Sequence, residues 1–337
     1  MKAYQLQRFG IDNLTMTDTE IPQPGPAEVL VRFHAASLNY RDLMIVKGTY
    51  NPRMKLPAVP FSDGAGEVAA IGEAVTKWKV GDRVCPIFMQ GWHEGGISAE
   101  KSKTALGGGA DWNGVLREYG AFSEQSLVRI PEPLSYEEAA TLPCAAVTAW
   151  NALVVSGCLK AGERVLTLGT GGVSIFAVQF ATMLGAEVIA TSSSYEKLGK
   201  VRELGAGETV NYKEREDWDK AVLELTSKLG VDHVVEVGGS GTMARSVNAV
   251  RSGGHISVIG VLASGGEFNP TSLLMKAVKM QGVYVGSRSM FEDMNRAIEI
   301  NGLHPVIDKQ FSFSEVREAL TYMETGSHFG KIVIDYN

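Results

Sequence analysis

The chain has 337 residues, of which 45% are hydrophobic and 21% are charged, and its formal net charge is -6. This length suits two globular domains, and the negative charge argues against nucleic acid or an anionic membrane as a main partner. The N-terminal segment lacks the apolar core of a signal peptide, no apolar run has the roughly 20 residues of a membrane span, and the three cysteines form no disulfide framework. We therefore expect a cytoplasmic protein.

The first third of the chain predicts short strands separated by turns. Residues 28–38 (EVLVRFHAASL) alternate like a half-buried strand, and glycines punctuate two further predicted strands at residues 66–72 and 80–88. Residues 60–68 (PFSDGAGEV) combine Gly-x-Gly with two carboxylates, but no helix follows to complete a nucleotide-binding unit. This segment is either a structural turn or a wall of the active site.

A long irregular stretch covers residues 90–114, and loops of this length in a compact domain are usually functional or mobile. Two interpretations of its apolar side chains remain open. They form either a lid over a hydrophobic acceptor or a small core of the loop itself. The side chains concerned are Phe88, Met89, Trp92 and Trp112.

The pattern changes near Pro131. Residues 135–154 predict helical structure, with Ser135 as N-cap and Glu138 three residues later. From Glu163 onward, apolar strands alternate with helical segments, which predicts a parallel, doubly wound sheet. The expected strands are residues 164–169, 187–192, 208–212, 231–238, 254–260 and 281–287. The segment after residue 290 predicts two helices and a final strand that returns to the first domain.

A glycine-rich turn between the first predicted strand of this series and the following helix has the context of a dinucleotide-binding loop. Glycine lets the backbone approach a pyrophosphate, and the helix N-terminus offers free N–H groups. Ser174 stands where a third glycine is usual. The loop therefore predicts cofactor contacts from Gly169, Thr170, Gly171, Gly172 and Val173.

Several motifs together resemble the medium-chain dehydrogenase/reductase superfamily over nearly the whole chain. They include GAGEVAAIG, AATLPCAAVTAWNAL, GTGGVS, GVDHVVEVGG and GKIVI. The resemblance implies an α/β protein with two domains. We expect a GroES-like, β-rich catalytic domain at residues 1–130 and 290–337, and a Rossmann-type domain with a doubly wound parallel sheet at residues 131–289.

Zinc alcohol dehydrogenases of this superfamily hold a catalytic zinc ion through three ligands. The resemblance places Asn39, Ser62 and Cys144 at those positions. Catalytic zinc needs three protein ligands of N, S or O type, and the side chains of Asn39 and Ser62 are poor ones. Residues 90–114 also lack the four cysteines of the structural zinc lobe. We therefore predict that the protein binds no metal.

The cofactor preference depends on the end of the second strand of the series. An acidic residue there would select NAD through the ribose 2′-OH, whereas this chain has Ser192 and Ser193, followed by Lys197. Hydroxyls and a lysine suit the 2′-phosphate of NADPH. The serines could also cap the next helix, a role that Ser194 could fill. The resemblance adds Thr148, Tyr212, Gly238, Gly260, Val261, Gly286, Ser287 and Lys331 as cofactor residues, with a solvated lysine as the alternative for Lys331.

Without zinc, no Lewis acid polarises a carbonyl group. We therefore expect hydride transfer from NADPH to a quinone or an α,β-unsaturated carbonyl compound, which carries its own electron sink. Candidate hydrogen-bond donors to the acceptor oxygen are Asn39, Tyr40 and Tyr50, and Met44 stands where several quinone reductases have a tyrosine. Two alternatives remain, an alcohol dehydrogenase with a degraded zinc site and a non-catalytic NADPH-binding protein.

The last strand of the parallel series, Gln281–Ser287, is expected at the edge of the sheet. An apolar edge strand needs a partner or a cover, and a twofold copy of itself is the simplest partner. We therefore expect a homodimer through this strand. The alternative is that a loop or the C-terminal helix covers the edge within one chain.

Overall fold

The computed structural model describes residues 1–109, 111–260, 266 and 268–336. The chain forms two compact units, of which unit 1 comprises Met1–Val147 and Gly286–Asn337, and unit 2 comprises Thr148–Val285. The boundaries predicted from the sequence, at residues 131 and 290, place residues 131–147 and 286–289 in the other unit. Among the described helices, none combines the length and the apolar character that a bilayer crossing requires.

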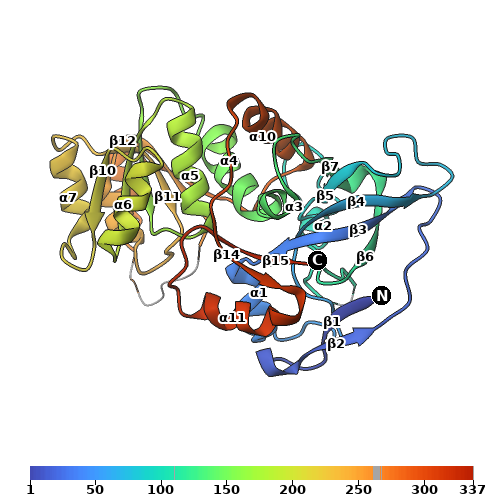
Figure 1. Cartoon of the computed structure of the whole chain (residues 1–337). Coiled ribbons are helices and arrows are strands. Elements are labelled where there is room, and N and C mark those ends of the chain that lie inside the picture. The colour runs from blue at the N-terminus through green and yellow to red at the C-terminus, as the bar shows by residue number, and fades with distance from the viewer. Residues whose placement is uncertain (110, 261–265, 267, 337) are drawn as a thin grey trace. The chain divides into compact units, whose positions relative to one another are not determined.

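Unit 1 contains a mainly antiparallel sheet with the strand order β14-β15-β3-β4-β5-β7, and β6 pairs with β3 (Figure 1). Only β14 and β15 are parallel within this described order. A separate antiparallel pair consists of β1 and β2. The strands are β1 (Lys2–Leu6), β2 (Leu14–Asp18), β3 (Glu28–Ser37), β4 (Asp63–Ile71), β5 (Arg83–Pro86), β6 (Tyr119–Ser123), β7 (Leu127–Arg129), β14 (Ile307–Ser312) and β15 (Lys331–Asp335).

The helices of unit 1 begin where the sequence offers caps. The predicted capping box at Ser135 is confirmed, because its hydroxyl accepts from Glu138 N at 3.2 Å and its N–H donates to the Glu138 carboxylate at 2.9 Å. The return of the C-terminal segment is also confirmed, since β15 pairs with β3. The helices are α1 (Tyr40–Val46), α2 (Ala99–Ser102), α3 (Tyr136–Ala139), α10 (Arg288–Asn301) and α11 (Val316–Glu324).

The Gly-x-Gly of residues 60–68 lies in a strand and not in a turn. Strand β4 begins at Asp63, and the register pairs Gly66 with Phe33 of β3. A Cβ atom on Gly66 would lie 2.0 Å from Arg32 O, so only glycine allows the two strands to approach this closely. The prediction of a structural turn is therefore wrong for these glycines, and the alternative, a wall of the active site, stays a prediction.

The long stretch after β5 buries most of the apolar side chains that the sequence analysis singled out. Phe88, Met89 and Trp92 are at most 3% exposed, and Trp92 Nε1 donates to Gly95 O at 2.8 Å. Trp112 alone of the four is substantially exposed, at 38%. The burial of the first three residues favours the interpretation as a core, and the interpretation as a lid over an acceptor stays untested.

Unit 2 contains a parallel sheet with the order β10-β9-β8-β11-β12-β13 among the described residues. Numbered from its first strand, this is the order 3-2-1-4-5-6 of the dinucleotide-binding fold, whose switch point lies between the first and fourth strands. Five of the predicted strands are therefore confirmed. The strands are β8 (Arg164–Leu168), β9 (Glu187–Ser192), β10 (Glu208–Asn211), β11 (Val231–Glu236), β12 (Val250–Val258) and β13 (Lys279–Gly282).

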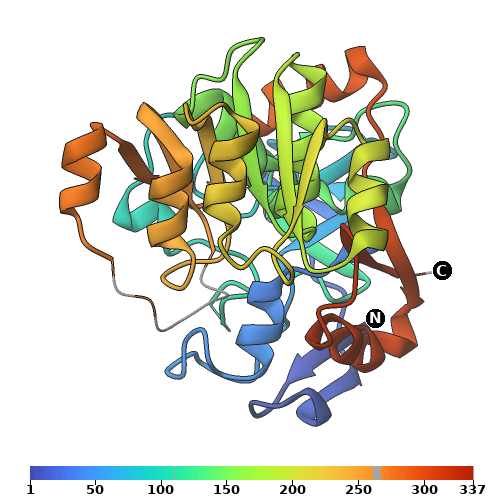
Figure 2. The ribbon, with the colours of Figure 1, turned by 90° about the vertical axis from the view of Figure 1, so that its left-hand side faces the viewer.

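Helices connect these strands and pack against the sheet, as Figures 1 and 2 show. The apolar helix α5 contacts β8 and β9, and α8 contacts β11 and β12. The helical segment predicted before the sheet contains two π-helical turns, Leu142–Ala146 and Asn151–Ser156, around α4. The helices are α4 (Val147–Trp150), α5 (Gly172–Met183), α6 (Tyr195–Glu203), α7 (Trp218–Leu225), α8 (Met243–Ala249) and α9 (Thr271–Lys276).

The sixth strand departs from the prediction in its bounds. It covers Lys279–Gly282, whereas the sequence predicts Gln281–Ser287. The chain leaves the sheet after Val283, whose N–H still donates to Val258 O at 2.8 Å, because Val285 adopts a left-handed conformation with φ of 56°. The predicted position at the edge of the sheet is confirmed, since β13 ends the strand order.

Candidate active site

The glycine loop after β8 leaves room for a ligand. Gly169 has φ of 72°, and a Cβ atom on Gly169 or Gly171 would meet no other atom within 4 Å. Helix α5 begins at Gly172, so its free N–H groups face the end of the loop. Ser174, at the position of the third glycine, is 1% exposed and donates to Leu168 O at 2.7 Å. The loop therefore suits a pyrophosphate, and the serine ties the helix to the strand.

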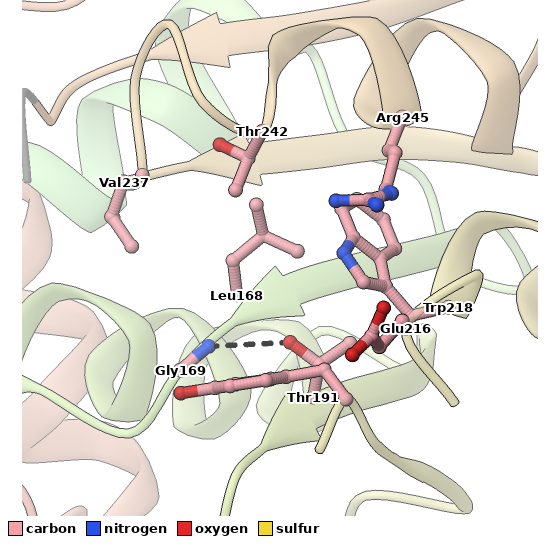
Figure 3. Close-up of a pocket in the computed structure, with 10 residues that line it drawn as sticks. Leu168, Gly169, Thr191, Glu216, Trp218, Val237, Thr242 and Arg245 are labelled. Atoms are coloured by element: carbon pink, nitrogen blue, oxygen red, sulfur yellow. Dashed lines mark hydrogen bonds between the residues drawn. The ribbon is translucent and has the colours of Figure 1, made fainter. Parts of the chain in front are cut away.

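A pocket of about 410 Å³ opens at the carboxyl ends of the parallel strands of unit 2. Figure 3 shows Glu216, Trp218 and Arg245 grouped at one end of it, with Gly169 and Val237 toward the other. The pocket lies at the switch point, where this fold binds dinucleotides. Its lining residues are Leu168, Gly169, Thr191, Tyr212, Glu216, Trp218, Val237, Gly238, Thr242 and Arg245.

Three of these lining residues, Gly169, Tyr212 and Gly238, are among the cofactor residues predicted from the sequence. The others were missed. Thr191 directly precedes Ser192 at the end of β9, so the strand pattern could have indicated it. Trp218 and Arg245 lie on α7 and α8, and nothing in their local sequence separates them from ordinary helix residues.

The hydroxyl residues after β9 divide between two roles. Ser194 is the N-cap of α6, and its Oγ accepts from Lys197 N at 3.4 Å, which confirms the capping alternative for this serine. Ser192 ends β9 and is 3% exposed, while Ser193 is exposed. Lys197 lies in the first turn of α6 and is partly buried. None of these residues lines the pocket, so their contact with a cofactor remains a prediction.

Glu236 organises the wall of the pocket formed by the loop after β11. This carboxylate is fully buried. Its Oε1 accepts from Gly238 N at 2.7 Å, Gly239 N at 3.0 Å and Thr242 Oγ1 at 2.6 Å, and its Oε2 accepts from Ser246 Oγ. The sequence analysis missed this residue. Its signal is an acidic residue that directly follows two valines at the end of a predicted strand.

The other predicted cofactor residues lie at structural positions. Gly260 lies beside Val237, and Thr148 is buried on α4. Ser287 is the N-cap of α10, and its Oγ accepts from Met290 N at 3.3 Å. Gly286 precedes it, and a Cβ atom there would lie 2.6 Å from Val147 Cγ1. Val261 lies outside the described residues.

A buried polar cluster in unit 1 joins α1, β4 and β15. Asn39 caps α1, and its Oδ1 accepts from Lys331 Nζ at 2.7 Å. Ser62 Oγ donates to Asp63 Oδ1 at 2.7 Å, and Cys144 N donates to Asp63 Oδ2 at 3.1 Å. Lys331 is 3% exposed, so the solvated alternative for this lysine is wrong.

Two acidic groups of this cluster, the Asp63 carboxyl and the Cys144 thiol, have raised pKa values. Burial raises the pKa of Asp63, against the opposing effects of Lys331 and of hydrogen bonds from Asn39, Ser62 and the Cys144 backbone. Burial also raises the pKa of the Cys144 thiol. The cluster therefore holds its charges away from solvent, with the lysine as the compensating cation.

The three positions of the family's catalytic zinc ligands do not fit a zinc ion. The Asn39 oxygen is already bonded to an ammonium group, which would repel a divalent cation, and the Ser62 hydroxyl donates its proton to Asp63. Cys144 is then the one residue of the three whose side chain is a good zinc ligand, and catalytic zinc needs three protein ligands. Among the described residues, no three His, Cys, Asp or Glu side chains are grouped as a metal site requires.

Tyr40 and Tyr50 are both partly exposed, at 47% and 40%. The Arg41 guanidinium lies between the rings of Tyr50 and Phe88, at 5.1 and 4.8 Å from their centroids, and its Nη1 donates to Leu106 O at 3.0 Å. Of the two tyrosines, Tyr50 is the one whose ring contacts the guanidinium of Arg41. Roles for both as donors to an acceptor remain predictions.

Asp42, the third residue of α1, is a second buried acid of unit 1. Burial raises its pKa to about 7, against the opposing charge of Arg41, whose Nη1 lies 4.0 Å away. Asp63 raises this pKa further, whereas the N–H of Asn39, which donates to Asp42 at 2.8 Å, and the charge of Lys331 lower it. The folded protein therefore binds this proton more tightly than the unfolded chain does.

We expect the Asp42→Asn variant to gain stability relative to the wild type as the pH rises from about 5 to about 8. Between the unfolded pKa near 3.8 and the folded pKa near 7, the folded state binds more protons, so wild-type stability falls as the pH rises. Asparagine does not titrate and can still accept from the Asn39 N–H. The relative gain should be at least about 1.4 kcal/mol, measured by urea unfolding. A difference that does not vary with pH would contradict the raised pKa.

Comparisons with known proteins agree with the division of the chain into two units. A family model described as "Zinc-binding dehydrogenase" matches residues 172–300, and one described as "Alcohol dehydrogenase GroES-like domain" matches residues 25–132. A zinc-type alcohol dehydrogenase-like protein of Schizosaccharomyces pombe is 45% identical over 333 residues, which cover 96% of either chain. A quinone oxidoreductase of Sus scrofa is 31% identical over 330 residues, 95% of this chain and 92% of its own. The solved structure of an NAD-dependent alcohol dehydrogenase is 32% identical and covers 100% of both chains, with a TM-score of 0.91.

Proposed function

Because the chain belongs to the medium-chain dehydrogenase/reductase superfamily, whose members are oxidoreductases with a nicotinamide cofactor, we propose that it reduces a quinone or an α,β-unsaturated carbonyl compound with NADPH and without zinc. The observation that carries the proposal is the Lys331 ammonium, which is bonded at 2.7 Å to the residue at the first zinc-ligand position. The quinone oxidoreductase of Sus scrofa supports this acceptor class.

The residues of the chain would contribute binding and polarity to this reaction. Bound NADPH would supply the hydride, held by the glycine loop and the pocket of unit 2. Such an acceptor needs no metal, because its conjugated carbonyl group takes up the electron pair as the hydride arrives at carbon. Asn39 Nδ2 can donate a hydrogen bond to the oxygen on which negative charge develops, and solvent supplies the proton that completes the reduction.

A turnover screen tests the proposal. The purified chain is dialysed against a chelator, its zinc content is measured, and NADPH oxidation is followed with 1,4-benzoquinone, an aliphatic enal and, in reverse, primary alcohols with NADP. We expect turnover of the quinone or enal by zinc-free protein. Activity that appears only when zinc is restored would favour the degraded alcohol dehydrogenase, and no turnover with any acceptor would favour a non-catalytic NADPH-binding protein.

We expect NADPH to bind at least about ten times more tightly than NADH, a difference of about 1.4 kcal/mol. The residue that ends β9 is Ser192, so no carboxylate is placed there to bind the ribose 2′-OH or to repel a 2′-phosphate. Fluorescence titration with both cofactors measures the ratio. Lys197→Ala should reduce it, whereas Lys200→Ala, on the same helix and paired with Glu196, should leave it unchanged.

A preference for NADH is the competing outcome. It has two supports, the NAD-dependent alcohol dehydrogenase with which the chain shares its fold, and the Glu216 carboxylate in the lining of the pocket. Arg245 lines the same pocket, and its positive charge opposes that of Glu216. Equal affinities, or tighter binding of NADH, would refute the NADPH assignment.

We also propose that the chain forms a homodimer through the edge of the unit 2 sheet. Strand β13 ends the sheet, and on the preceding helix α9 the side chains of Leu274 and Met275 are each 78% exposed. Light scattering at micromolar concentration should give the dimer mass, and Met275→Glu should reduce it to the monomer. Ile300→Glu, equally exposed on α10, is the control. A monomeric wild type, or a dimer insensitive to Met275→Glu, would contradict this interface.

A substitution at Val283 would be a poorer test of this interface. The N–H of Val283 donates to Val258 O within the same chain, so Val283→Pro would remove a hydrogen bond of the folded monomer. Changes on the exposed face of α9 affect no such bond.

A further inference from the structure

The Lys331 ammonium is held by the segment that carries Asn39. Lys331 is the first residue of β15, and its Nζ donates to Leu38 O and to Asn39 Oδ1, both at 2.7 Å. Asp63 Oδ2 lies 4.0 Å from the same nitrogen. A buried ammonium is costly unless it is paired and hydrogen-bonded, so the contacts fix the lysine in one position.

The lysine also determines which end of the Asn39 carboxamide faces it. An ammonium group has three donors and no acceptor, so only the oxygen Oδ1 can face Lys331. The amide nitrogen Nδ2 then faces away from the lysine, where Ser62 Oγ accepts from it at 3.5 Å and the Asp63 carboxylate also accepts from the Asn39 side chain. The hydrogen bond to Ser62 is weak at that length. Because the amide nitrogen carries two N–H bonds, it can donate to an acceptor oxygen as well.

Ser62 cannot compete for the opposite orientation of the amide. Its Oγ gives its own proton to Asp63 Oδ1 at 2.7 Å, so toward Asn39 it can act only as an acceptor. Lys331 as a donor, and Ser62 and Asp63 as acceptors, thus select the same orientation of the carboxamide. Asn39 itself is partly exposed, whereas Lys331 and Ser62 are buried.

We propose that Lys331 is a positioning residue that orients the Asn39 amide and strengthens Nδ2 as the hydrogen-bond donor to the oxygen of the acceptor. A positive charge on the carbonyl oxygen of an amide polarises its N–H bonds, since linked hydrogen bonds strengthen one another. The inference rests on the proposed function. The lysine would then stabilise, through Asn39, the negative charge on the acceptor oxygen, a role that a metal ion has in zinc enzymes.

A double-mutant cycle between Lys331→Met and Asn39→Ala tests the proposal on the full chain. Turnover of 1,4-benzoquinone and the dissociation constant of NADPH are measured for the wild type, both single variants and the double variant. We expect either single variant to lower kcat by about tenfold or more, and the double variant to be no slower than Asn39→Ala. The affinity for NADPH should stay within about twofold in all four proteins.

Two further variants guard against an effect on folding alone. Lys331→Arg keeps the charge if Lys331→Met does not fold, and its loss of kcat should likewise disappear in the Asn39→Ala background. Asn39→Asp keeps an acceptor for the lysine but removes the N–H donors, and should lower kcat as much as Asn39→Ala.

If the losses in kcat of the two single variants add up in the double variant, the proposal is overturned, because additive effects show that Lys331 and Asn39 act independently. A tenfold or larger loss of NADPH affinity in Lys331→Met with kcat unchanged would also overturn it and assign the lysine to the cofactor. These results differ from a failure of the proposed function, in which the wild type itself shows no turnover and the inference falls with it.

Discussion

Replacing Glu236 by alanine should lower the free energy of unfolding by at least about 3 kcal/mol and weaken cofactor binding, because several buried donors lose their acceptor together. The two carboxylate oxygens accept from the backbone N–H groups of Gly238 and Gly239 and from the hydroxyls of Thr242 and Ser246. Alanine offers no acceptor, and the fully buried site admits no bulk water to replace it.

The consequence for the pocket follows from where these donors lie. Gly238 and Thr242 line it, so a loop released from Glu236 loses the shape of one wall. Urea unfolding measures the loss of stability, and fluorescence titration measures the loss of affinity for NADPH. Both losses should appear in the same variant.

Glu236→Gln is the matched control. Its amide oxygen can keep the bonds from Gly238, Gly239 and Thr242, and its NH₂ group can donate to Ser246 Oγ, which then acts as the acceptor. We expect this variant to lose no more than about 1 kcal/mol. An alanine variant as stable as the glutamine variant would show that the carboxylate does not organise the loop.

The parallel sheet of unit 2 was predictable because its central strands, such as β8 and β9, are buried on both faces and have largely apolar sequences. Strands β8 and β9 match the predicted ranges within one residue. The sixth strand was misplaced because residues 283–285 are as apolar as a strand, while the left-handed conformation of Val285 directs the chain out of the sheet. A left-handed conformation is rare for a β-branched residue such as valine, so the sequence did not predict it here.

The candidate site was only partly predictable, and for a physical reason. The glycine loop is contiguous, so its residues could be assigned together from one motif. The pocket wall depends on Glu236, and the orientation of Asn39 depends on Lys331, which is 292 residues away in the chain. A single sequence carries no signal for a hydrogen bond between segments that far apart.

The sequence showed that Asn39 and Ser62 are poor zinc ligands. It did not show that a buried lysine lies beside these positions. A lysine before a terminal strand is usually solvated, and composition does not distinguish a buried one. The structure shows that Lys331 and Asp63 are buried together, so each limits the cost of burying the other. The polar cluster is thus a network in which the buried ammonium and the buried carboxylate lie beside each other.

Gly260→Ala should be among the most damaging single-methyl additions to unit 2. A Cβ atom at Gly260 would lie 1.7 Å from the oxygen of Val237, 2.4 Å from its carbonyl carbon and 2.7 Å from its Cα. These are backbone atoms, so no side chain can move aside. The end of β12 would have to separate from the end of β11, although Gly260 N now donates to Glu236 O at 3.2 Å. We expect a loss of at least about 3 kcal/mol in the free energy of unfolding.

The same displacement should reach the pocket, because Val237 lines it, and the affinity for NADPH should fall with the stability. Gly199→Ala is the matched control, since its new methyl group on α6 would meet no atom within 4 Å. Alanine at that helical position should raise stability by up to about 1 kcal/mol. Opposite signs for the two variants in urea unfolding would confirm that close approach of β11 and β12 requires the glycine. A Gly260→Ala protein with an unchanged midpoint and unchanged NADPH affinity would refute it.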